Sequence, residues 1–345
     1  MHDVVDLRSD TLTLPTPEMR EAMARADVGD DVYEEDPTVR RLETLAAERL
    51  GKAAALFVTS GTQGNLVSVL AQTRPGQEVV LDVDAHIFNS EVAGATVIGG
   101  VQLRPVRTER GFLSPAQVRE AIRPANIHLP PTGLVCLENT HNRHGGTCCT
   151  PEEIAAVAAV AHEAGVAVHL DGARLFNAAV ALGRPARDFA RDVDSVTFCV
   201  SKGLGAPVGS VVCASADVIG RARRVRKMLG SGMRQAGVIA AAGVVALERM
   251  VDRLAEDHVN ARRLAEGVAG LPSVSIDLTS VQTNIVIFRV GRPGGVDELA
   301  RGCAARKVKI HAMSPTSIRC VTHKDVDADD IGRTLDAFTE ITTGW

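Results

Sequence analysis

Lys202 stands just after a run of apolar and β-branched residues, 193–200, and just before a loop rich in glycine. Such a run is typical of a buried strand, and ligands bind in α/β sheets at the carboxyl ends of the strands. Lysine is rarely buried unless it is paired or chemically modified, so an amine at this place is suited to forming a Schiff base with a carbonyl compound. A lysine that extends from the strand end into solvent explains the same residues equally well.

Two further predicted strands end in residues that would complement the lysine. The strand at 53–59 leads through Ser60-Gly61-Thr62 into a helix, an arrangement that offers backbone N–H groups and the positive end of the helix dipole to an anion. An ordinary capped helix start explains this turn as well. The strand at 166–170 ends at Asp171, whose carboxylate needs a cationic partner in an apolar sheet. A Schiff-base lysine, an acid for a pyridinium nitrogen and an anion site are the three contacts that pyridoxal phosphate requires.

Strands and helices alternate over residues 53–214, which indicates an α/β domain with a doubly wound, parallel or mixed sheet. Beyond residue 251, the predicted elements indicate a small α+β domain. We therefore expect an N-terminal segment, 1–30, that contributes to the small domain and to the site, a large domain at 31–250 and a small domain at 251–345. The predicted strands lie at 53–59, 78–83, within 97–106, and at 133–137, 166–170, 193–200, 210–214, 274–277, 284–290, 308–312 and 317–322.

The composition argues against several classes of partner. The net charge of −4 is too small to indicate a nucleic-acid-binding protein. The longest apolar run, 238–247, is far shorter than the roughly 20 residues that cross a bilayer, and the first residues lack the basic and apolar regions of a signal peptide. Seven cysteines without Cys-x-x-Cys spacing are typical of reduced thiols. We expect a cytoplasmic protein with no nucleic-acid or membrane partner.

One short stretch has the residue types of a metal site. It contains His141, His144, Cys148 and Cys149, and histidine and cysteine are common ligands of zinc. The two adjacent cysteines have poor geometry for chelating one ion. We therefore expect no zinc here and assign no metal ligand.

The chain resembles the threonine aldolases, which are pyridoxal-phosphate enzymes of the aspartate-aminotransferase-like fold. The resemblance rests on eight stretches that run in the order of the family over nearly the whole chain. They are Asp6-Leu7-Arg8-Ser9-Asp10-Thr11, Val28-Gly29-Asp30-Asp31-Val32-Tyr33, Ser60-Gly61-Thr62-Gln63, Leu137-Glu138-Asn139-Thr140-His141-Asn142, His169-Leu170-Asp171-Gly172-Ala173-Arg174, Ser201-Lys202-Gly203-Leu204-Gly205-Ala206-Pro207-Val208-Gly209, Gly232-Met233-Arg234-Gln235 and Val321-Thr322-His323.

The resemblance implies a role for each residue at the strand ends. Lys202 would form the Schiff base with pyridoxal phosphate, and Asp171 would hold the ring nitrogen of the cofactor. The other implied cofactor contacts are Gly61, Thr62 and Ser201 on the phosphate and His86, stacked on the ring.

The resemblance also implies substrate contacts. Ser9, Arg174 and Arg319 resemble the groups that hold the substrate carboxylate, and Tyr33 is placed with them in the substrate site. Forked guanidinium donors are suited to a carboxylate. Taken singly, Arg174 would more simply be a salt bridge at a helix start, and Arg319 a charge at a strand edge.

Two basic residues imply an oligomer. Lys227 and Arg234 resemble residues that reach the phosphate of a neighbouring subunit, which implies a homodimer or homotetramer with the site at the interface. His128 resembles a second histidine near the substrate hydroxyl, but a histidine ahead of two prolines is also typical of an ordinary loop.

The implied reaction is the retro-aldol cleavage of L-threonine, L-allo-threonine and other β-hydroxy-α-amino acids to glycine and an aldehyde. The base could be His86, His128 or a water between them, because the pKa of histidine lies near neutrality; we favour a water held by a histidine. Arg143-His144 stands where many members have Gly-Lys, and Glu34 stands where glycine is common. Both differences leave the substrate range and the threo/allo preference open.

Four other functions compete with this one. A β-eliminating lyase or an aminotransferase would share the fold and differ in its products. A dinucleotide-dependent dehydrogenase needs a Gly-x-Gly-x-x-Gly turn, which Ser60-Gly61-Thr62-Gln63-Gly64 does not supply. A non-catalytic scaffold would have no reason to hold the lysine, the aspartate and the arginines together.

Overall fold

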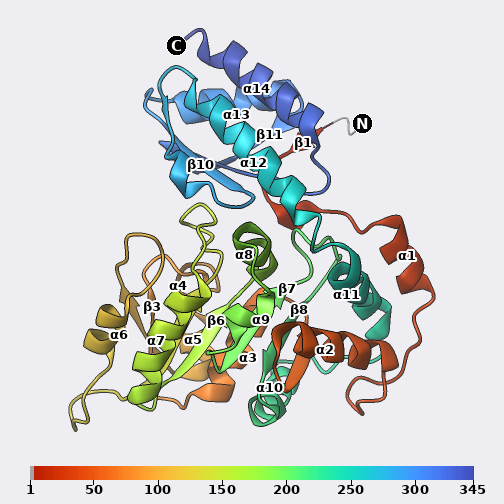
Figure 1. Cartoon of the computed structure of the whole chain (residues 1–345), viewed down its shortest axis with the longest axis vertical. Coiled ribbons are helices and arrows are strands. Elements are labelled where there is room, and N and C mark those ends of the chain that lie inside the picture. Colours follow the sequence, from red (N-terminus) through yellow and green to blue (C-terminus); the bar gives the residue numbers. More distant parts are fainter. Residues whose placement is uncertain (1–3) are drawn as a thin grey trace.

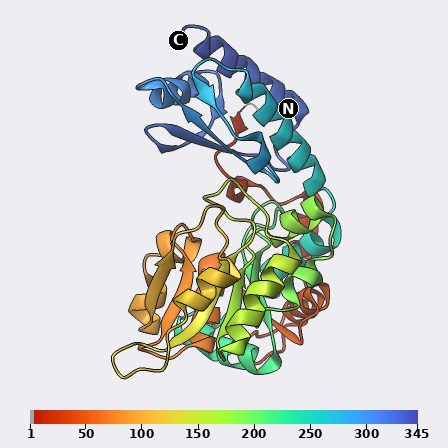
Figure 2. The ribbon, with the colours of Figure 1, turned by 60° about the vertical axis from the view of Figure 1, so that its left-hand side comes forward.

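The computed structural model describes residues 4–345, which form a larger and a smaller lobe (Figures 1 and 2). The first three residues of the expected N-terminal segment, 1–30, lie outside the described residues. In Figure 1 the larger lobe lies below, and the smaller lobe, which holds β1 (Val5–Asp6) and α14 (Ala328–Thr342), lies above. Helix α12 (Leu254–Ala269) runs from the junction of the lobes into the smaller one.

The larger lobe is built on a seven-stranded sheet with the order β2-β8-β7-β6-β5-β3-β4. Among the described strands of this sheet, β8 alone runs opposite to the others, antiparallel to both β2 and β7. The α/β fold with a doubly wound, mixed sheet is thereby confirmed. The strands are β2 (Ala54–Val58), β3 (Glu78–Asp82), β4 (Gln102–Val106), β5 (Thr132–Glu138), β6 (Ala167–Asp171), β7 (Ser195–Cys199) and β8 (Ser210–Ala214).

Two layers of helices cover this sheet because side chains alternate between the two faces of each strand. In β2, Leu56 and Val58 belong to the apolar cluster of one face, and Phe57 belongs to that of the other. The first layer contains α3 (Gly61–Gln72), α4 (His86–Asn89), α5 (Gly94–Gly99) and α10 (Ala216–Met228). The second contains α1 (Pro17–Ala24), α2 (Pro37–Leu50), α6 (Pro115–Ala121), α7 (Pro151–Glu163), α8 (Leu175–Leu182), α9 (Ala186–Ala190) and α11 (Gly237–Arg249).

The smaller lobe has a four-stranded antiparallel sheet and takes in the start of the chain. The sheet has the order β12 (His311–Ser314), β13 (Ser317–Val321), β10 (Ile285–Val290) and β9 (Val274–Ser275). It packs with α12, α13 (Gly295–Ala305) and α14. Strand β1 pairs in parallel with β11 (Val308–Lys309), and both Val5 and Leu7 are buried in the core of this lobe.

One predicted strand is divided in the structure, and another lies within its expected range. The strand expected within 97–106 occupies Gln102–Val106, because α5 ends at Gly99 and the φ of 64° at Gly100 stops the helix ahead of the strand. The strand predicted at 308–312 is two strands, β11 and β12, that join different sheets. The sequence pattern does not show this change of partner, because both pieces are short and lie on either side of the single residue Ile310.

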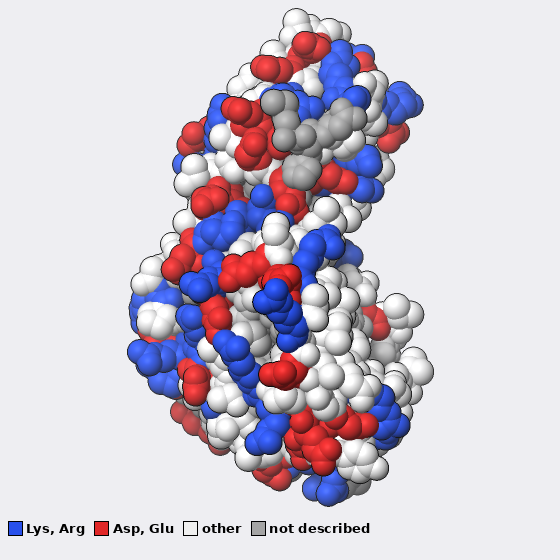
Figure 3. All heavy atoms as spheres, turned by 90° about the vertical axis from the view of Figure 1, so that its right-hand side faces the viewer, with Lys and Arg blue, Asp and Glu red and all other residues white. Residues whose placement is uncertain are grey.

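Charged side chains of both signs are intermixed on the face of the molecule shown in Figure 3. Among the described residues, no helix combines the length and the apolar composition that crossing a bilayer requires.

Candidate active site

The carboxyl ends of the parallel strands meet at one edge of the larger sheet. The polar residues of the site lie at these strand ends or in the segments that follow them. Asp82, Glu138 and Asp171 are the last residues of β3, β5 and β6, and the register places Glu138 beside Asp171. Lys202 follows β7, and its carbonyl oxygen accepts hydrogen bonds from Thr13 Oγ1, at 2.9 Å, and from the N–H of Gly205, at 2.8 Å. No hydrogen bond or ion pair of the Lys202 ammonium group is found among the described residues.

Asp171 is held in one orientation by donors on both of its oxygens. The carboxylate is buried; Oδ2 accepts from Asn65 Nδ2 at 2.8 Å, and Oδ1 accepts from the N–H of Ala173 at 3.0 Å. Asn65 lies in α3, one helical turn after Gly61. An acid fixed in this way can face a pyridinium nitrogen without having to reorganise.

His169 fixes the orientation of Asn65 in turn. Its Nε2 lies 3.1 Å from Asn65 Oδ1, and its Nδ1 lies 2.8 Å from Ser195 Oγ. Burial lowers the pKa of His169 to about 4, so the ring is neutral at pH 7. Because the amide oxygen of Asn65 can only accept, the proton is on Nε2, and Nδ1 accepts from the Ser195 hydroxyl.

His86 joins the same network through a buried acid. Its Nδ1 lies 2.7 Å from Glu91 Oε1, which also accepts from Asn65 Nδ2 at 2.8 Å. Although burial lowers the pKa of His86, the hydrogen bond to Glu91 and the charges of Asp171, Glu91 and Glu138 raise it. Burial raises the pKa of Glu91, and the charge of Asp171 raises it further. The imidazole remains about one-third exposed, at 30%, so Nε2 is left for other partners.

The start of α3 has the free donors of an anion site. Ser60 caps the helix by accepting from the N–H of Gln63 at 3.1 Å, and no hydrogen bond of the N–H groups of Gly61 and Thr62 is found among the described residues. A Cβ at Gly61 would lie 3.0 Å from Cys199 Sγ, so glycine lets this helix start lie against β7. Ser201, beside Lys202, donates to the carbonyl of Gly209 at 3.1 Å, so its hydroxyl would have to turn from Gly209 to donate to a phosphate.

Two arginines from the two lobes converge on one oxygen. Arg174 Nη1 and Arg319 Nη1 donate to Asn142 Oδ1 at 3.3 Å and 3.0 Å. Arg319 comes from β13 of the smaller lobe, and its buried Nε has no hydrogen-bond partner among the described residues. Burial and the charge of Arg174 lower the pKa of Arg319. A neutral amide oxygen between two guanidinium groups marks a place where a carboxylate oxygen would be bound more strongly.

Asp10 orients Arg174 from the other side. Its two oxygens accept from Nε and Nη2 of Arg174, each at 2.7 Å, and both residues are buried. Burial opposes the ionisation of Asp10, but the charge and hydrogen bonds of Arg174 hold its pKa well below the usual range. Ser9, the residue before Asp10, caps a short 3₁₀ helix by accepting from the N–H of Thr11 at 3.2 Å.

Four of the expected site residues are not brought to this cluster within one chain. His128 is exposed in the loop ahead of β5, at the opposite edge of the sheet from Lys202. Tyr33 is 73% exposed. Lys227 and Arg234 are exposed as well and flank a loop whose Ser231 Oγ accepts from Gln63 Nε2 at 2.5 Å, so this loop borders the start of α3.

The residues that the sequence did not identify are those that orient other residues of the site through hydrogen bonds. Asn65 could have been found, since it lies one turn after Gly61 on the same helix. Asn142 and Asp10 lie inside matching motifs, but the sequence does not show that both contact Arg174. Glu91 has no signal in the sequence, because it lies in an irregular segment between α4 and α5 and meets Asn65 only through the fold.

Lys202, Asp171 and the start of α3 together fit a pyridine aldehyde that carries a phosphate. An amine and two N–H groups that lack partners within residues 4–345 lie along one sheet edge with a buried, hydrogen-bonded carboxylate. They match the aldehyde, the ring nitrogen and the phosphate of pyridoxal phosphate.

Comparison with known proteins gives concordant results. The β-eliminating lyase family model matches residues 6–290. Low-specificity L-threonine aldolase 1 of Arabidopsis thaliana is 43% identical over 97% of this chain and 96% of its own length. The low specificity L-threonine aldolase of Escherichia coli K12 is 44% identical over 95% and 96%. The threonine aldolase structure from Leishmania major superposes with a TM-score of 0.84 at 21% identity, over 98% of this chain and 99% of that one.

Proposed function

Because the chain belongs to the threonine aldolase family of the β-eliminating lyases, we propose that it cleaves L-threonine and L-allo-threonine to glycine and acetaldehyde. Other β-hydroxy-α-amino acids would give glycine and the corresponding aldehyde. The protein is an enzyme of the lyase class.

The convergence of Arg174 and Arg319 carries this proposal. Both donate to Asn142 Oδ1, at the sheet edge that also holds Lys202 and Asp171. A substrate carboxylate that replaced the amide oxygen would gain two charge-assisted contacts. Held at one end in this way, the amino acid would have its Cα–Cβ bond in a fixed orientation, which contributes to the rate by positioning.

Pyridoxal phosphate, held by Lys202, would supply the electron sink for the electron pair released when the Cα–Cβ bond breaks. Asp171, oriented by Asn65, would hold the ring nitrogen in its protonated form. The N–H groups of Gly61 and Thr62 would bind the phosphate, and the hydroxyl of Ser201 would donate to it after turning from the carbonyl of Gly209.

His86 is the residue of this chain that can move the hydroxyl proton. Glu91 holds its Nδ1, which leaves Nε2 to accept a proton directly or through a water molecule. Because His128 is exposed in the loop ahead of β5, we infer that it would act in the site of another subunit.

An oligomer would complete the site. The exposure of Lys227, Arg234, Tyr33 and His128 supports a homodimer or homotetramer in which these residues serve a neighbouring subunit. We assign the enzyme to the cytoplasm, to glycine formation and to threonine breakdown. The domain division at residues 31–250 and 251–345 is supported by the separate apolar cores of the two lobes.

The test is a product assay on purified protein. The protein should be yellow, borohydride should fix the chromophore on Lys202, and L-threonine or L-allo-threonine should yield glycine and acetaldehyde. A Lys202→Ala variant that kept full activity would contradict the role of the lysine. Formation of a keto acid with ammonia, or only in the presence of an amino acceptor, would show a β-eliminating lyase or an aminotransferase instead.

A further inference from the structure

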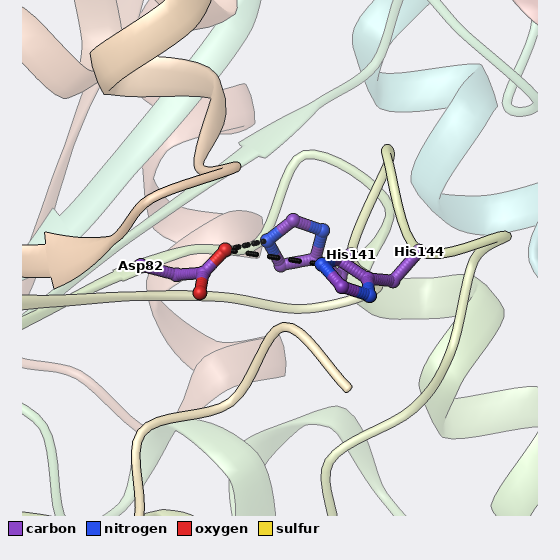
Figure 4. Close-up of side chains that lie close together, drawn as sticks. All are labelled: Asp82, His141 and His144. Atoms are coloured by element: carbon purple, nitrogen blue, oxygen red, sulfur yellow. Dashed lines mark ion pairs between the residues drawn. The ribbon is translucent and has the colours of Figure 1, made fainter. Parts of the chain in front are cut away.

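Three side chains next to the proposed active site form a cluster that the proposed function does not use. Asp82 ends β3, and His141 and His144 lie in the loop after β5 (Figure 4). Asp82 Oδ1 lies 3.3 Å from His141 Nε2 and 4.0 Å from His144 Nε2. One potential ligand atom from each residue lies within 4.8 Å of the other two.

His141 is incompletely satisfied in this cluster, because its Nε2 faces Asp82 Oδ1 at 3.3 Å without the geometry of a hydrogen bond. Its side chain is 0% exposed, and neither ring nitrogen has a hydrogen-bond partner among the described residues. Buried polar groups almost always have a partner, and an unpaired one costs free energy of folding. Figure 4 shows its Nε2 directed toward Asp82, so a ligand between these two atoms would satisfy it.

Other groups around the cluster favour a cation. Thr108 Oγ1 donates to Asp82 Oδ2 at 2.7 Å and the N–H of Asp84 donates to Oδ1 at 2.8 Å, which orients the carboxylate with Oδ1 toward the histidines. Asp84 Oδ2 lies 3.2 Å from His144 Nε2, and Glu138 Oε2 lies 3.9 Å from His141 Nε2. Three carboxylates therefore surround two imidazoles.

We propose that Asp82, His141 and His144 bind a divalent transition-metal ion of the zinc type. Two imidazole nitrogens and one carboxylate oxygen form a known three-residue donor set for zinc, with water as the fourth ligand. Metal–ligand bonds of about 2.0–2.1 Å in a tetrahedral site place the donor atoms roughly 3.3 Å apart. Asp82 and His141 already have this spacing, and His144, at 21% side-chain exposure, must approach by roughly 1 Å.

The adjacent cysteines take no part. We expected no zinc in this stretch because Cys148 and Cys149 would chelate poorly, but the third ligand here comes from another strand. Burial raises the pKa of Cys148 to about 12, so this residue stays a thiol. Its Sγ contacts the carbonyl oxygen of Gly146 at 4.0 Å.

A second group, His86, Glu91 and Asp171, has similar spacing, and we assign it no metal. Its carboxylates are already occupied by Asn65, which donates to both. The first group differs in His141, whose buried ring nitrogens have no hydrogen-bond partner among the described residues, whereas His144 Nε2 lies 3.2 Å from Asp84 Oδ2 and Asp82 Oδ1 accepts from the N–H of Asp84 at 2.8 Å.

The ion would position residues of the active site. Asn142, which accepts from Arg174 and Arg319, lies between the two histidine ligands in the chain, and Asp82 lies shortly before His86. Metal binding would tie the loop of Asn142 to the end of β3. We therefore expect the ion to stabilise the protein and to lower KM more than it raises kcat.

The test uses the untagged holoenzyme, stripped with a chelator and reloaded with pyridoxal phosphate. Calorimetric titration with Zn²⁺ should show one ion per chain, and Co²⁺ should give a visible spectrum without thiolate bands. In His144→Gln the affinity should fall at least tenfold, and Zn²⁺ should no longer raise Tm. His144 is the main variant because Asp82→Asn alters a buried, hydrogen-bonded carboxylate.

His162→Gln is the matched control. His162 is an exposed histidine that contacts a single carboxylate, Asp194, at 2.9 Å. Its variant should bind Zn²⁺ as the parent protein does. If the parent binds no Zn²⁺, or if His144→Gln binds it with unchanged affinity, the site does not exist; the second result would point to the cofactor or another residue as the ligand.

Discussion

Asn65 connects Asp171 to Glu91, the acid that holds His86. Its amide nitrogen donates to Glu91 and to Asp171, and its amide oxygen accepts from His169. Both the amide nitrogen and the amide oxygen of Asn65 are hydrogen-bonded, so rotating the amide would break these hydrogen bonds. The position of His86 relative to Asp171 therefore depends on residues that never contact the substrate.

Glu91→Gln should shift the pH profile of the enzyme. The charge of Glu91 favours protonated His86, and a base must be deprotonated to act, so activity falls as pH drops through the pKa of His86. Glutamine keeps the shape but not the charge; the pKa of His86 falls, and the acid limb of kcat/KM should move about 1 pH unit lower. The measurement is kcat/KM from pH 5 to 9.

Asp194→Asn is the control for that experiment, since Asp194 pairs with the exposed His162. It should leave the profile unchanged. An acid limb that stayed in place in Glu91→Gln, with the protein folded, would mean that His86 is not the titrating base.

Asp10→Asn should destabilise the protein and weaken substrate binding. The substitution leaves the buried guanidinium of Arg174 without its counter-charge, and breaking a buried pair costs about 3–5 kcal/mol of the free energy of unfolding. KM should rise, because Arg174 loses its orienting partner. The control is Glu248→Gln, which breaks an exposed pair with Arg41 and should cost less than about 1 kcal/mol.

The pH dependence of stability provides a second check on Asp10. Its pKa is lower in the folded than in the unfolded protein, so its contribution is present above the unfolded value of about 4 and is lost as pH falls toward the folded value. When the pH is lowered from 5, the free energy of unfolding should therefore fall less in Asp10→Asn than in the parent protein. Equal acid-dependent losses in urea unfolding experiments would contradict the assignment.

At the scale of elements, α3 places both the anion site and Asn65. The helix lies close to β7 because Gly64 has no side chain; a Cβ there would lie 2.5 Å from Thr197 Cγ2. The start of the helix and its second turn are thereby fixed to the strand that leads to Lys202.

Gly64→Ala should push α3 away from β7. Overpacking of this kind costs about 1–3 kcal/mol, and the shift of the N–H groups of Gly61 and Thr62 should weaken cofactor binding. Thermal unfolding and a fluorescence titration with pyridoxal phosphate measure the two effects.

Gly220→Ala is the matched substitution in α10. Gly220 is exposed, and a Cβ there would meet nothing within 4 Å. Because alanine restricts the unfolded chain and favours helix, this variant should gain about 0.5–1 kcal/mol and bind the cofactor normally. If both variants lost similar stability, the cause would be a general effect of alanine in these helices, and the close packing of α3 on β7 would not explain it.

The strand ends were the most predictable part of the site. Lys202, Asp171 and Gly61 each follow an apolar run, and parallel strands bring such ends to one edge whatever the details of packing. Glu91, Asp10 and Asp82 were not predictable in their roles, because each meets its partner through a contact between segments far apart in the chain. Alternation along a strand shows which face a residue takes, but not which distant side chain faces it.

The whole molecule places the site between its lobes. Arg174 comes from the larger lobe and Arg319 from the smaller, and Asp10, in the N-terminal segment, contacts both Arg174 and Asn284. The start of the chain is therefore part of the junction, and β1 anchors it in the smaller lobe. The geometry of the substrate carboxylate site thus depends on how the two lobes are held together.

Complementation between inactive variants should reveal whether Arg234 serves a neighbouring subunit. Lys202→Ala lacks the amine, and Arg234→Ala lacks a phosphate contact; each homo-oligomer should be inactive or weak. If the site combines Lys202 of one chain with Arg234 of the next, each mixed dimer has one site with both native residues. Statistical mixing then restores about a quarter of the native sites in a two-fold dimer.

If both residues belong to the same chain's site, co-refolded mixtures should show no more activity than the average of the two variants, and the assignment of Arg234 to the partner's phosphate would be wrong.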